Sequence, residues 1–280
     1  MNSRIIIIGC KGFIGAEIYS ELNKKFKNVV GISKKEIDLT KNNSLKKLKS
    51  LIKDGDTVVF VSAIAPCKDI SCLKTNLDIV NNFISAVGEK KLRQIINISS
   101  DAVYTDSLNK IDEGSKTNPT SLHGIMHISR EHLLHTYFGN ILSIVRPTLV
   151  YGIKDPHNGY GPNKFRRLII NNEDIRLFGK GEELRDHVCV NDIAKMVTKI
   201  ISKSSFGIFN AVSGNVMTFY EIANYLKVLY KSEIKINISK RTGPMPHLGK
   251  RTFKKSKAEK IFSNFKFKSI KKGLKELVNK

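Results

Sequence analysis

The fold is decided near the start of the chain, by Arg4-Ile5-Ile6-Ile7-Ile8-Gly9-Cys10-Lys11-Gly12-Phe13-Ile14-Gly15. The apolar run predicts a buried strand, and the helix-like residues 16–22 follow the three glycines directly. Gly9 permits a tight turn, Gly12 lets the backbone approach a ligand, and Gly15 lets the helix pack against the strand. Because free N–H groups at a helix start attract anions, the stretch predicts a site for the pyrophosphate of a dinucleotide. The expected contacts are Gly9, Gly12, Phe13, Ile14 and Gly15.

The residues after the second predicted strand bear on which dinucleotide is bound. That strand covers residues 28–32, and Ser33, Lys34 and Lys35 follow it where an adenosine ribose normally meets the protein. A hydroxyl followed by two cations suits the 2′-phosphate of NADP, whereas an acidic residue would bind the ribose hydroxyl of NAD. We therefore expect NADP or NAD, with Ser33 and Lys34 favouring NADP. Two alternatives stay open: the lysines are ordinary solvated loop residues, or Glu36 serves NAD if the strand ends later.

Length and composition are those of a globular α/β protein. At 280 residues with 41% hydrophobic content, the chain can bury a sizeable core. The opening apolar run is too short to span a bilayer and lacks the cleavage site of a signal peptide, so we expect a cytoplasmic protein with no membrane partner. Cys10, Cys67, Cys72 and Cys189 show no pairing pattern and are expected to be reduced thiols, not disulfides or zinc ligands.

The chain also carries a large positive charge. Its 48 Lys and Arg exceed its 25 Asp and Glu, which gives +23 at pH 7. Dense cations bind phosphates, yet only 10 of the 48 are Arg, the residue that recognition of base edges favours. The lysines are scattered, with concentrations at residues 46–53 and 250–280. We therefore expect no nucleic acid partner, and we expect the charge to attract an anionic substrate.

Apolar strand-like runs alternate with amphipathic stretches along the first half of the chain. The predicted strands cover residues 4–8, 28–32, 57–62, 94–99 and 141–146, and the predicted helices lie near residues 14–25, 43–52, 73–87 and 122–137. This alternation indicates an α/β fold of the Rossmann type, a doubly wound parallel sheet with helices on both faces. We expect residues 1–150 to bind the dinucleotide. Residues 151–280, with helices near 163–171 and 218–230, are expected to form a smaller α/β substrate-binding region interleaved with the first.

Further motifs extend along nearly the whole chain. They are Asp38-Leu39-Thr40, Ser62-Ala63, Asn76, residues 98–104, Arg146-Pro147 with Tyr151-Gly152, and residues 177–181, 185–188 and 192–194. With the glycine loop, they resemble the extended short-chain dehydrogenase/reductase family of nucleotide-sugar epimerases, dehydratases and reductases. The resemblance implies that Asp38 and Leu39 approach the adenine and that Ser62 and Ala63 meet the cofactor. The resemblance is compatible with a homodimer but does not predict one.

The expected catalytic centre departs from the family pattern. The resemblance implies Tyr-x-x-x-Lys downstream of the serine segment, but alignment through Gly124 and Glu131 places His123 on the tyrosine and His127 on the lysine. An imidazole exchanges protons near neutral pH without the help that a tyrosine needs. We therefore expect His123 to be the general acid/base at a sugar oxygen that Ser100 holds. His127 is expected to bind the nicotinamide ribose or to tune His123.

Two other interpretations of the histidine pair stay open. The chain could be a dinucleotide- or nucleotide-sugar-binding protein that has lost its chemistry, because both family residues are replaced. Alternatively, His123, His127 and Glu131 share one helix face at i, i+4 and i+8 and could hold a metal ion. We expect no metal, since the resemblance already explains the glutamate and no His-Glu-x-x-His order is present.

The serine segment and the second half of the chain narrow the reaction and the substrate. Family dehydratases carry Asp-Glu after the hydroxyl residue, whereas Ser100 precedes Asp101 and an alanine, so epimerisation or keto reduction is favoured over dehydration. The resemblance implies a nucleoside-diphosphate sugar, contacted by Ser100, Asp101, Asn163 and Arg185. A guanidinium suits two phosphate oxygens, although an ion pair of Arg185 with a neighbouring aspartate remains an alternative.

Overall fold

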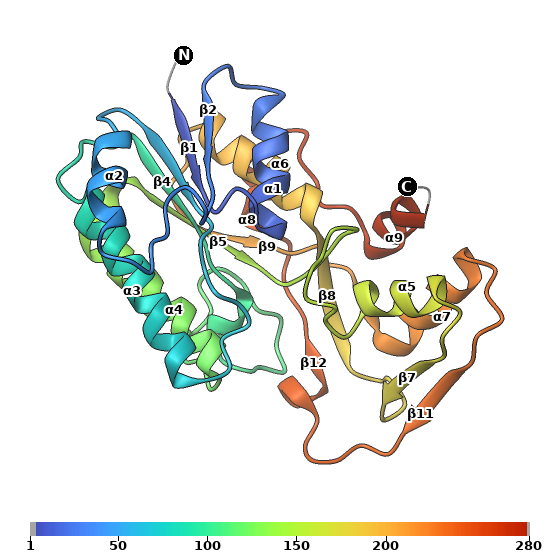
Figure 1. Ribbon diagram of the computed structural model, residues 1–280. Helices are drawn as coiled ribbons and strands as arrows, with labels where there is room; N and C mark the ends of the chain where they lie inside the picture. The colour runs from blue at the N-terminus through green and yellow to red at the C-terminus, as the bar shows by residue number, and fades with distance from the viewer. Residues whose placement is uncertain (1–3, 279–280) are drawn as a thin grey trace. The chain divides into compact units, whose positions relative to one another are not determined.

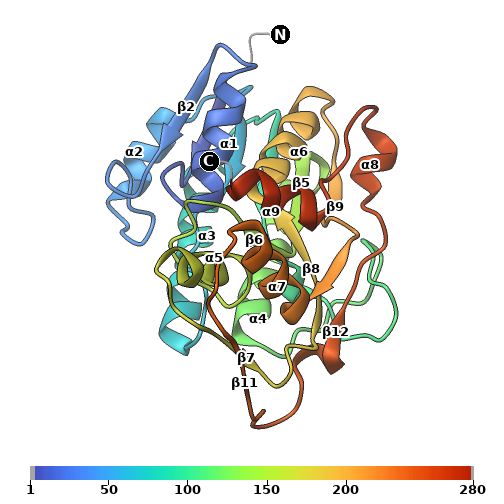
Figure 2. The same cartoon turned by 90° about the vertical axis from the view of Figure 1, so that its right-hand side faces the viewer.

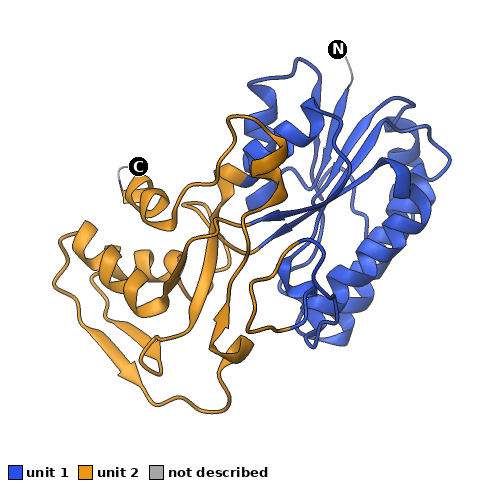
Figure 3. Ribbon diagram, turned by 180° about the vertical axis from the view of Figure 1, so that it is seen from behind, with its two compact units in different colours: residues 1–105, 113–147, 193–211 blue, residues 106–112, 148–192, 212–280 orange. Residues whose placement is uncertain are grey.

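The computed structural model describes residues 4–278, which form two compact units. The first unit combines residues 4–105, 113–147 and 193–211, and the second combines residues 106–112, 148–192 and 212–278, coloured blue and orange in Figure 3. The two units are interleaved along the chain. Residues 106–112 belong to the second unit although they precede residue 150, and residues 193–211 belong to the first unit although they follow it.

The first unit is built on a six-stranded parallel sheet with the order β2-β1-β3-β4-β5-β9. Its strands are β1 (Ile5–Ile8), β2 (Val29–Ile32), β3 (Thr57–Phe60), β4 (Gln94–Ile98), β5 (Leu142–Pro147) and β9 (Gly207–Ala211). β2 and β3 lie on opposite sides of β1, so the strand order reverses there. Ligands of doubly wound sheets bind at the carboxyl ends of the strands at such a reversal.

Helices cover both faces of this sheet. α2 (Ser44–Leu51), α3 (Ile70–Val87) and α4 (Leu122–Phe138) lie on one face, and α1 (Phe13–Asn23) and α6 (Val190–Ser202) lie on the other (Figure 1). Between the first face and its helices lies a core in which Phe60 of β3 stacks on Phe83 of α3, with ring centroids 4.5 Å apart. The Rossmann-type fold expected from the sequence is confirmed.

The second unit is smaller and has mixed sheets. β8 (Leu184–Cys189) pairs with β6 (Leu149–Tyr151), β10 (Val216–Thr218) and β12 (Lys250–Arg251), and β7 (Ile175–Phe178) pairs with β11 (Ile236–Ser239). α5 (Pro162–Ile170), α7 (Phe219–Leu229) and α9 (Ile270–Val278) enclose its apolar core, and α7 lies beside α9 (Figure 2). The short helix α8 (Lys257–Ile261) precedes α9.

The helices and strands expected in the first 150 residues are all present, with ends shifted by at most a few residues. The helices expected near residues 163–171 and 218–230 are α5 and α7. α6 and β9 were not expected, although β9 completes the sheet of the first unit beside β5. Over residues 4–278, none of the helices has the length and hydropathy needed to cross a membrane.

Candidate functional site

The glycine loop lies between β1 and α1, as the sequence predicts. Gly9 has a φ of +96°, and a Cβ there would lie 2.9 Å from the backbone nitrogen of Ser62 at the end of β3. A Cβ on Gly15 would collide with the carbonyl oxygen of Gly9, so that glycine allows α1 to pack on the turn. Gly12 differs, because a Cβ there would meet only the same carbonyl oxygen, at an ordinary 3.5 Å. The packing of the protein therefore does not require a glycine at position 12. A glycine is expected at such a position if the space beside it is needed by a bound ligand.

The start of α1 has the features of an anion site. Gly12 is the N-cap and offers no side chain to the first turn, which also contains no acidic residue. The N–H groups of Phe13, Ile14 and Gly15 therefore face the loop without a capping side chain. The positive end of the helix and these donors fit a pyrophosphate. These features and the space at Gly12 together fit a dinucleotide bound at this edge of the sheet.

At the end of β2, a carboxylate lies where the 2′-hydroxyl or 2′-phosphate of an adenosine ribose would contact the protein. The strand ends at Ile32, and the buried Ser33 donates its N–H to Oε2 of Glu36 at 2.7 Å. This hydrogen bond, with Lys11 of the glycine loop and Lys47, lowers the pKa of Glu36. Lys34 is exposed. Glu36 thus reaches this position by folding back onto the strand end, not through a longer strand.

The Asp38-Leu39 segment follows and is fixed locally. Oδ1 of Asp38 accepts hydrogen bonds from the N–H and the hydroxyl of Thr40, at 3.0 and 2.7 Å. The carbonyl of Leu39 accepts from Asn82 of α3 at 2.8 Å, and the Leu39 side chain is buried. The structure therefore gives this segment one half-buried carboxylate and one core residue.

The segment after β3 lies beside the glycine loop. Ser62 touches Gly9, and the next residue, Ala63, is half-buried. The backbone N–H and carbonyl of Ile64 are both bound by the side chain of the fully buried Asn76, at 2.9 and 3.0 Å. A single amide on α3 therefore holds the segment that follows Ser62 and Ala63.

The serine segment and the start of α4 pack closely together. Ser100 is the N-cap of a short 3₁₀ turn, and its Oγ accepts from the N–H of Ala102 at 3.1 Å. A Cβ on Gly124 would collide with the carbonyl oxygen of Ala102, so glycine lets α4 rest on this turn. Asp101, which is buried, acts electrostatically on His123 in the first turn of α4. Ser100, Asp101 and His123 are thus gathered at one place in the first unit.

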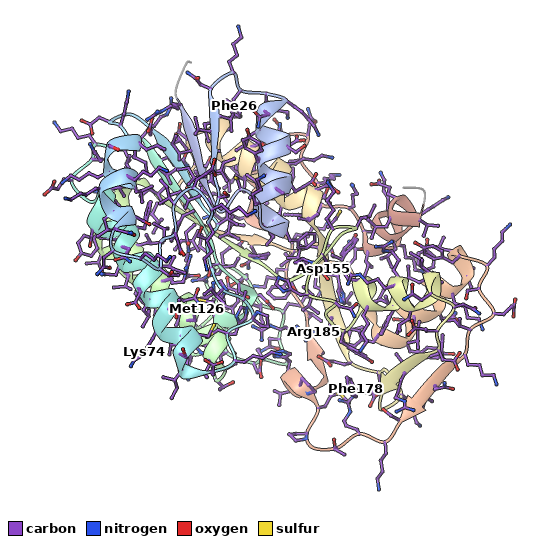
Figure 4. All side chains as sticks on the ribbon, in the orientation of Figure 1. Phe26, Lys74, Met126, Asp155, Phe178 and Arg185 are labelled. Carbon is purple, nitrogen blue, oxygen red and sulfur yellow. The ribbon has the colours of Figure 1, made fainter. Side chains whose placement is uncertain are left out.

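The two histidines of α4 lie one helical turn apart and in contact. Their ring centroids are 4.7 Å apart and the rings are perpendicular. His127 is only 5% exposed, and its Nδ1 has no hydrogen-bond partner among residues 4–278. Burial holds its pKa well below the ordinary value, and the charges of His123 and Arg130 act in the same direction. His127 is therefore a neutral ring at neutral pH. Figure 4 labels its neighbour Met126 on α4.

Arg130 is a member of this cluster that no sequence signal indicated. It is fully buried on α4, and burial lowers its pKa to about 10. Its Nη2 donates to the carbonyl of Ser62 at 2.8 Å, and its guanidinium lies 4.8 Å from the ring centroid of Phe60. Its Nε and Nη1 have no partner within the described part of the chain. A cation is therefore present in this region although the family lysine is absent.

Glu131 is occupied by other groups. Its carboxylate accepts hydrogen bonds from the hydroxyl of Ser99 and from the guanidinium of Arg146. A metal site formed by His123, His127 and Glu131, the alternative left open by the sequence, would therefore lack a free carboxylate ligand. Over residues 4–278, no group of three His, Cys, Asp or Glu side chains is placed to hold a metal ion.

The two substrate residues expected in the second unit are held there by their own neighbours. The buried Asn163 accepts from the N–H of Gly152 at 3.0 Å and donates to the carbonyl of Val150 at 3.2 Å. Arg185, labelled in Figure 4, pairs with Glu183 at 2.9 Å, and its Nε has no partner among the described residues. The ion pair foreseen for Arg185 thus forms with Glu183 and not with Asp186 or Asp192.

A second buried histidine lies two residues after Arg185 on β8. His187 is 1% exposed, and both of its ring nitrogens lack partners within residues 4–278. Its ring lies 5.8 Å from that of Phe219, and burial lowers its pKa to about 3. His187 is therefore a neutral packing residue of the second unit at neutral pH.

The chain is similar to known proteins over most of its length. The family described as NAD dependent epimerase/dehydratase matches residues 5–211. A Bacillus subtilis protein named as an uncharacterized UDP-glucose epimerase is 25% identical over 234 residues, covering 71% of this chain and 73% of its own.

Solved structures show the same fold. A UDP-N-acetylglucosamine 4-epimerase from Methanobrevibacter ruminantium, in complex with UDP-N-acetylmuramic acid, matches with a TM-score of 0.84 and 22% identity, covering 99% of this chain and 97% of that one. A Thermus thermophilus UDP-glucose 4-epimerase in complex with NAD matches with a TM-score of 0.84 and 19% identity, covering 99% and 98%.

Proposed function

Since the chain belongs to the NAD dependent epimerase/dehydratase family, we propose that it is a cytoplasmic enzyme that epimerises or reduces a nucleoside-diphosphate sugar at a carbonyl-bearing carbon, using NAD. The observation that carries this proposal is the gathering of Ser100, Asp101 and His123 in the unit that also holds the glycine loop and the bare start of α1. A dinucleotide supplies or removes a hydride when it is bound. The chain must then supply only an oxygen clamp and a group that exchanges a proton.

The roles of the chain's residues follow from their positions. The N–H groups at the start of α1 bind the pyrophosphate, and the carboxylate of Glu36 accepts a hydrogen bond from the adenosine ribose. Ser100 has its Oγ lone pair turned to Ala102, so its hydroxyl hydrogen is available to the sugar oxygen. His123 stands at the family tyrosine position and exchanges the proton of that oxygen. The sequence resemblance assigns Arg185 to the diphosphate of the sugar nucleotide, and its Nε, which has no partner among residues 4–278, is a suitable donor.

NAD is favoured over NADP by the position of Glu36. Lys34, Lys35 and Glu36 are all solvent-exposed, and the Glu36 carboxylate is held at the end of β2 by the N–H of Ser33. A negative charge there repels a 2′-phosphate and binds a 2′-hydroxyl. Dehydration is not proposed, because Ala102 stands where the second carboxylate would be needed.

Two measurements on the purified full chain test the proposal. Denaturation should release a dinucleotide, or added NAD should bind and raise the unfolding midpoint. The absorbance of reduced nicotinamide should then change with at least one member of a panel of nucleotide sugars and their 4-keto forms. Dinucleotide binding without turnover across the panel would identify a silent binding protein instead.

A further inference from the structure

The ring of His123 is approached on one side by a backbone donor. The N–H of Cys67 points to Nδ1 of His123, with the two nitrogens 3.4 Å apart. Cys67 is 4% exposed, and no other acceptor for its amide is found among residues 4–278. A buried amide needs an acceptor, and a backbone N–H can only donate. Nδ1 must therefore present its lone pair.

The segment that carries this amide is fixed at both ends. Asn76 binds both backbone groups of Ile64, and Arg130 binds the carbonyl of Ser62. The thiol of Cys67 donates to the carbonyl of Asp69, the N-cap of the 18-residue helix α3. The position of the Cys67 amide beside His123 is thus fixed by contacts on both sides of it.

A lone pair on Nδ1 decides where a neutral ring carries its proton. A neutral imidazole has one N–H, which must then be on Nε2. An imidazolium has an N–H on both nitrogens, so protonating His123 would set its Nδ1–H against the N–H of Cys67. The Nε2 atom, which has no partner in the described part of the chain, is the one free to meet a ligand.

The surrounding charges agree with a neutral ring. The carboxylate of Asp101 raises the pKa of His123, but burial lowers it more, so the net shift is downward. The ring of His127 on α4 also lies against His123, and His127 is itself held neutral, because burial and then the charges of His123 and Arg130 lower its pKa. Cys67 approaches from the segment after β3, and its thiol is uncharged, because burial raises its pKa to about 11.

We propose that the amide of Cys67 holds His123 as the neutral tautomer with its proton on Nε2, so that the resting site donates a hydrogen bond to the carbonyl oxygen of a keto sugar. A carbonyl oxygen only accepts hydrogen bonds, and Nε2–H together with the Ser100 hydroxyl gives it two donors. Reduction of the carbonyl leaves a negatively charged oxygen that takes one proton; Nε2–H supplies this proton, and the ring regains a proton at Nε2 from solvent. A sugar hydroxyl would instead need a free lone pair to take its proton, and Nε2 has none in this tautomer. The assignment of a keto substrate rests on the function proposed above, whereas the tautomer does not.

The tautomer is measured directly on the full chain by nuclear magnetic resonance. Protein labelled with ¹⁵N at histidine gives two-bond nitrogen–proton correlations whose pattern distinguishes Nε2–H, Nδ1–H and doubly protonated rings. The His123→Gln variant assigns the signals of His123 by their loss. At neutral pH we expect the Nε2–H pattern for His123. An Nδ1–H or doubly protonated pattern overturns the proposal.

Two variants of Cys67 separate the amide from the thiol. Cys67→Ala keeps the backbone N–H, and we expect it to keep the Nε2–H pattern. Cys67→Pro removes the N–H, and we expect a mixture of tautomers or a ring that protonates more readily. An unchanged pattern in a folded Cys67→Pro variant overturns the role of the amide. If this variant does not fold, the wild-type spectrum still decides the tautomer.

The substrate assignment is tested separately. With reduced cofactor and a keto sugar, we expect initial turnover at least about tenfold faster than with oxidised cofactor and the matching alcohol. Faster turnover of the alcohol from an enzyme in the Nε2–H state overturns the keto assignment. An Nε2–H tautomer without turnover of either sugar would instead refute the proposed function and leave the tautomer standing.

Discussion

Glu131 and Arg146 form a buried ion pair that joins α4 to β5. Nη2 of Arg146 lies 2.5 Å from Oε2 of Glu131, and Nε lies 3.0 Å from Oε1, so the contact is bidentate. Both side chains are 4% exposed. The Arg146 guanidinium also lies 4.8 Å from the ring centroid of Tyr104, the residue that ends the serine segment. One ion pair thus fixes the helix that carries the two histidines relative to the serine segment.

Removing one partner of this pair is expected to destabilise the protein strongly. Glu131→Ala would leave the Arg146 charge buried without its carboxylate, and breaking such a pair costs about 3–5 kcal/mol of unfolding free energy. Urea unfolding measures the loss. Glu89→Gln is the matched control, because Glu89 pairs with Lys49 at the surface and is 86% exposed, and it should leave the midpoint unchanged. Equal effects of the two variants would contradict a structural role for the buried pair.

Gly12 and Gly15 are expected to differ when each is replaced by alanine. The protein has room for a Cβ at position 12, at 3.5 Å from the nearest carbonyl oxygen, but not at position 15. Gly12→Ala should therefore keep the unfolding midpoint of the apoprotein and weaken NAD binding at least about tenfold, which is about 1.4 kcal/mol. Gly15→Ala should lower both. Calorimetric titration and thermal unfolding measure the two quantities, and unchanged NAD binding by Gly12→Ala would refute the pyrophosphate site.

Glu36 is expected to set the preference for NAD. The wild-type chain should bind NAD more tightly than NADP, because the carboxylate at the end of β2 repels a 2′-phosphate. Glu36→Gln should reduce the ratio of the two dissociation constants by about tenfold or more. Glu89→Gln, which removes an exposed carboxylate elsewhere, should leave the ratio unchanged. A wild-type preference for NADP would instead support the role expected for Ser33 and Lys34.

Arg130 is expected to contribute to the low pKa of His127. Burial is the main cause of that low pKa and the positive charge of Arg130 adds to it, so Arg130→Met should raise the pKa of His127 part of the way toward the ordinary histidine value of about 6.5. Arg130→Lys keeps the charge and should keep the pKa low. Titration of the His127 ring signals by nuclear magnetic resonance follows both variants. A His127 pKa that stays low in Arg130→Met would show that burial alone accounts for it.

His187 is expected to make the protein less stable in acid. Its pKa is about 3 in the folded chain and about 6.5 in an unfolded one, so the unfolded state binds the extra proton between these values. Its contribution to stability is complete above about pH 6.5 and falls by about 1.4 kcal/mol per pH unit as the pH drops toward the folded value. His187→Phe should reduce this slope, as followed by urea unfolding. The exposed His132→Gln should leave it unchanged, and a wild-type stability independent of pH below 6 would contradict the burial of His187.

The sequence predicted the elements of the first 150 residues well, because each strand there is an apolar run that alternates with amphipathic helices. α6 and β9 were missed since they follow the loosely patterned residues after 151, and β9 contains a glycine and an asparagine. The site was predicted only in part. The glycine loop, Ser100 and His123 are recognisable by their residue types and spacing. The Cys67 amide is not, because every residue except proline has a backbone N–H. In the sequence, Arg130 looks like an exposed residue of a helix. Only the structure shows that it contacts Phe60 and Ser62.

The most direct test of the account compares the wild-type chain with His123→Ala in one assay. Reduced nicotinamide absorbance is followed with cofactor and the nucleotide-linked keto sugar that the panel identifies. We expect turnover by the wild type and a loss of at least about a hundredfold in His123→Ala, with NAD binding unchanged. Full turnover by His123→Ala would contradict the account, because the proton of the sugar oxygen would then be exchanged by another group.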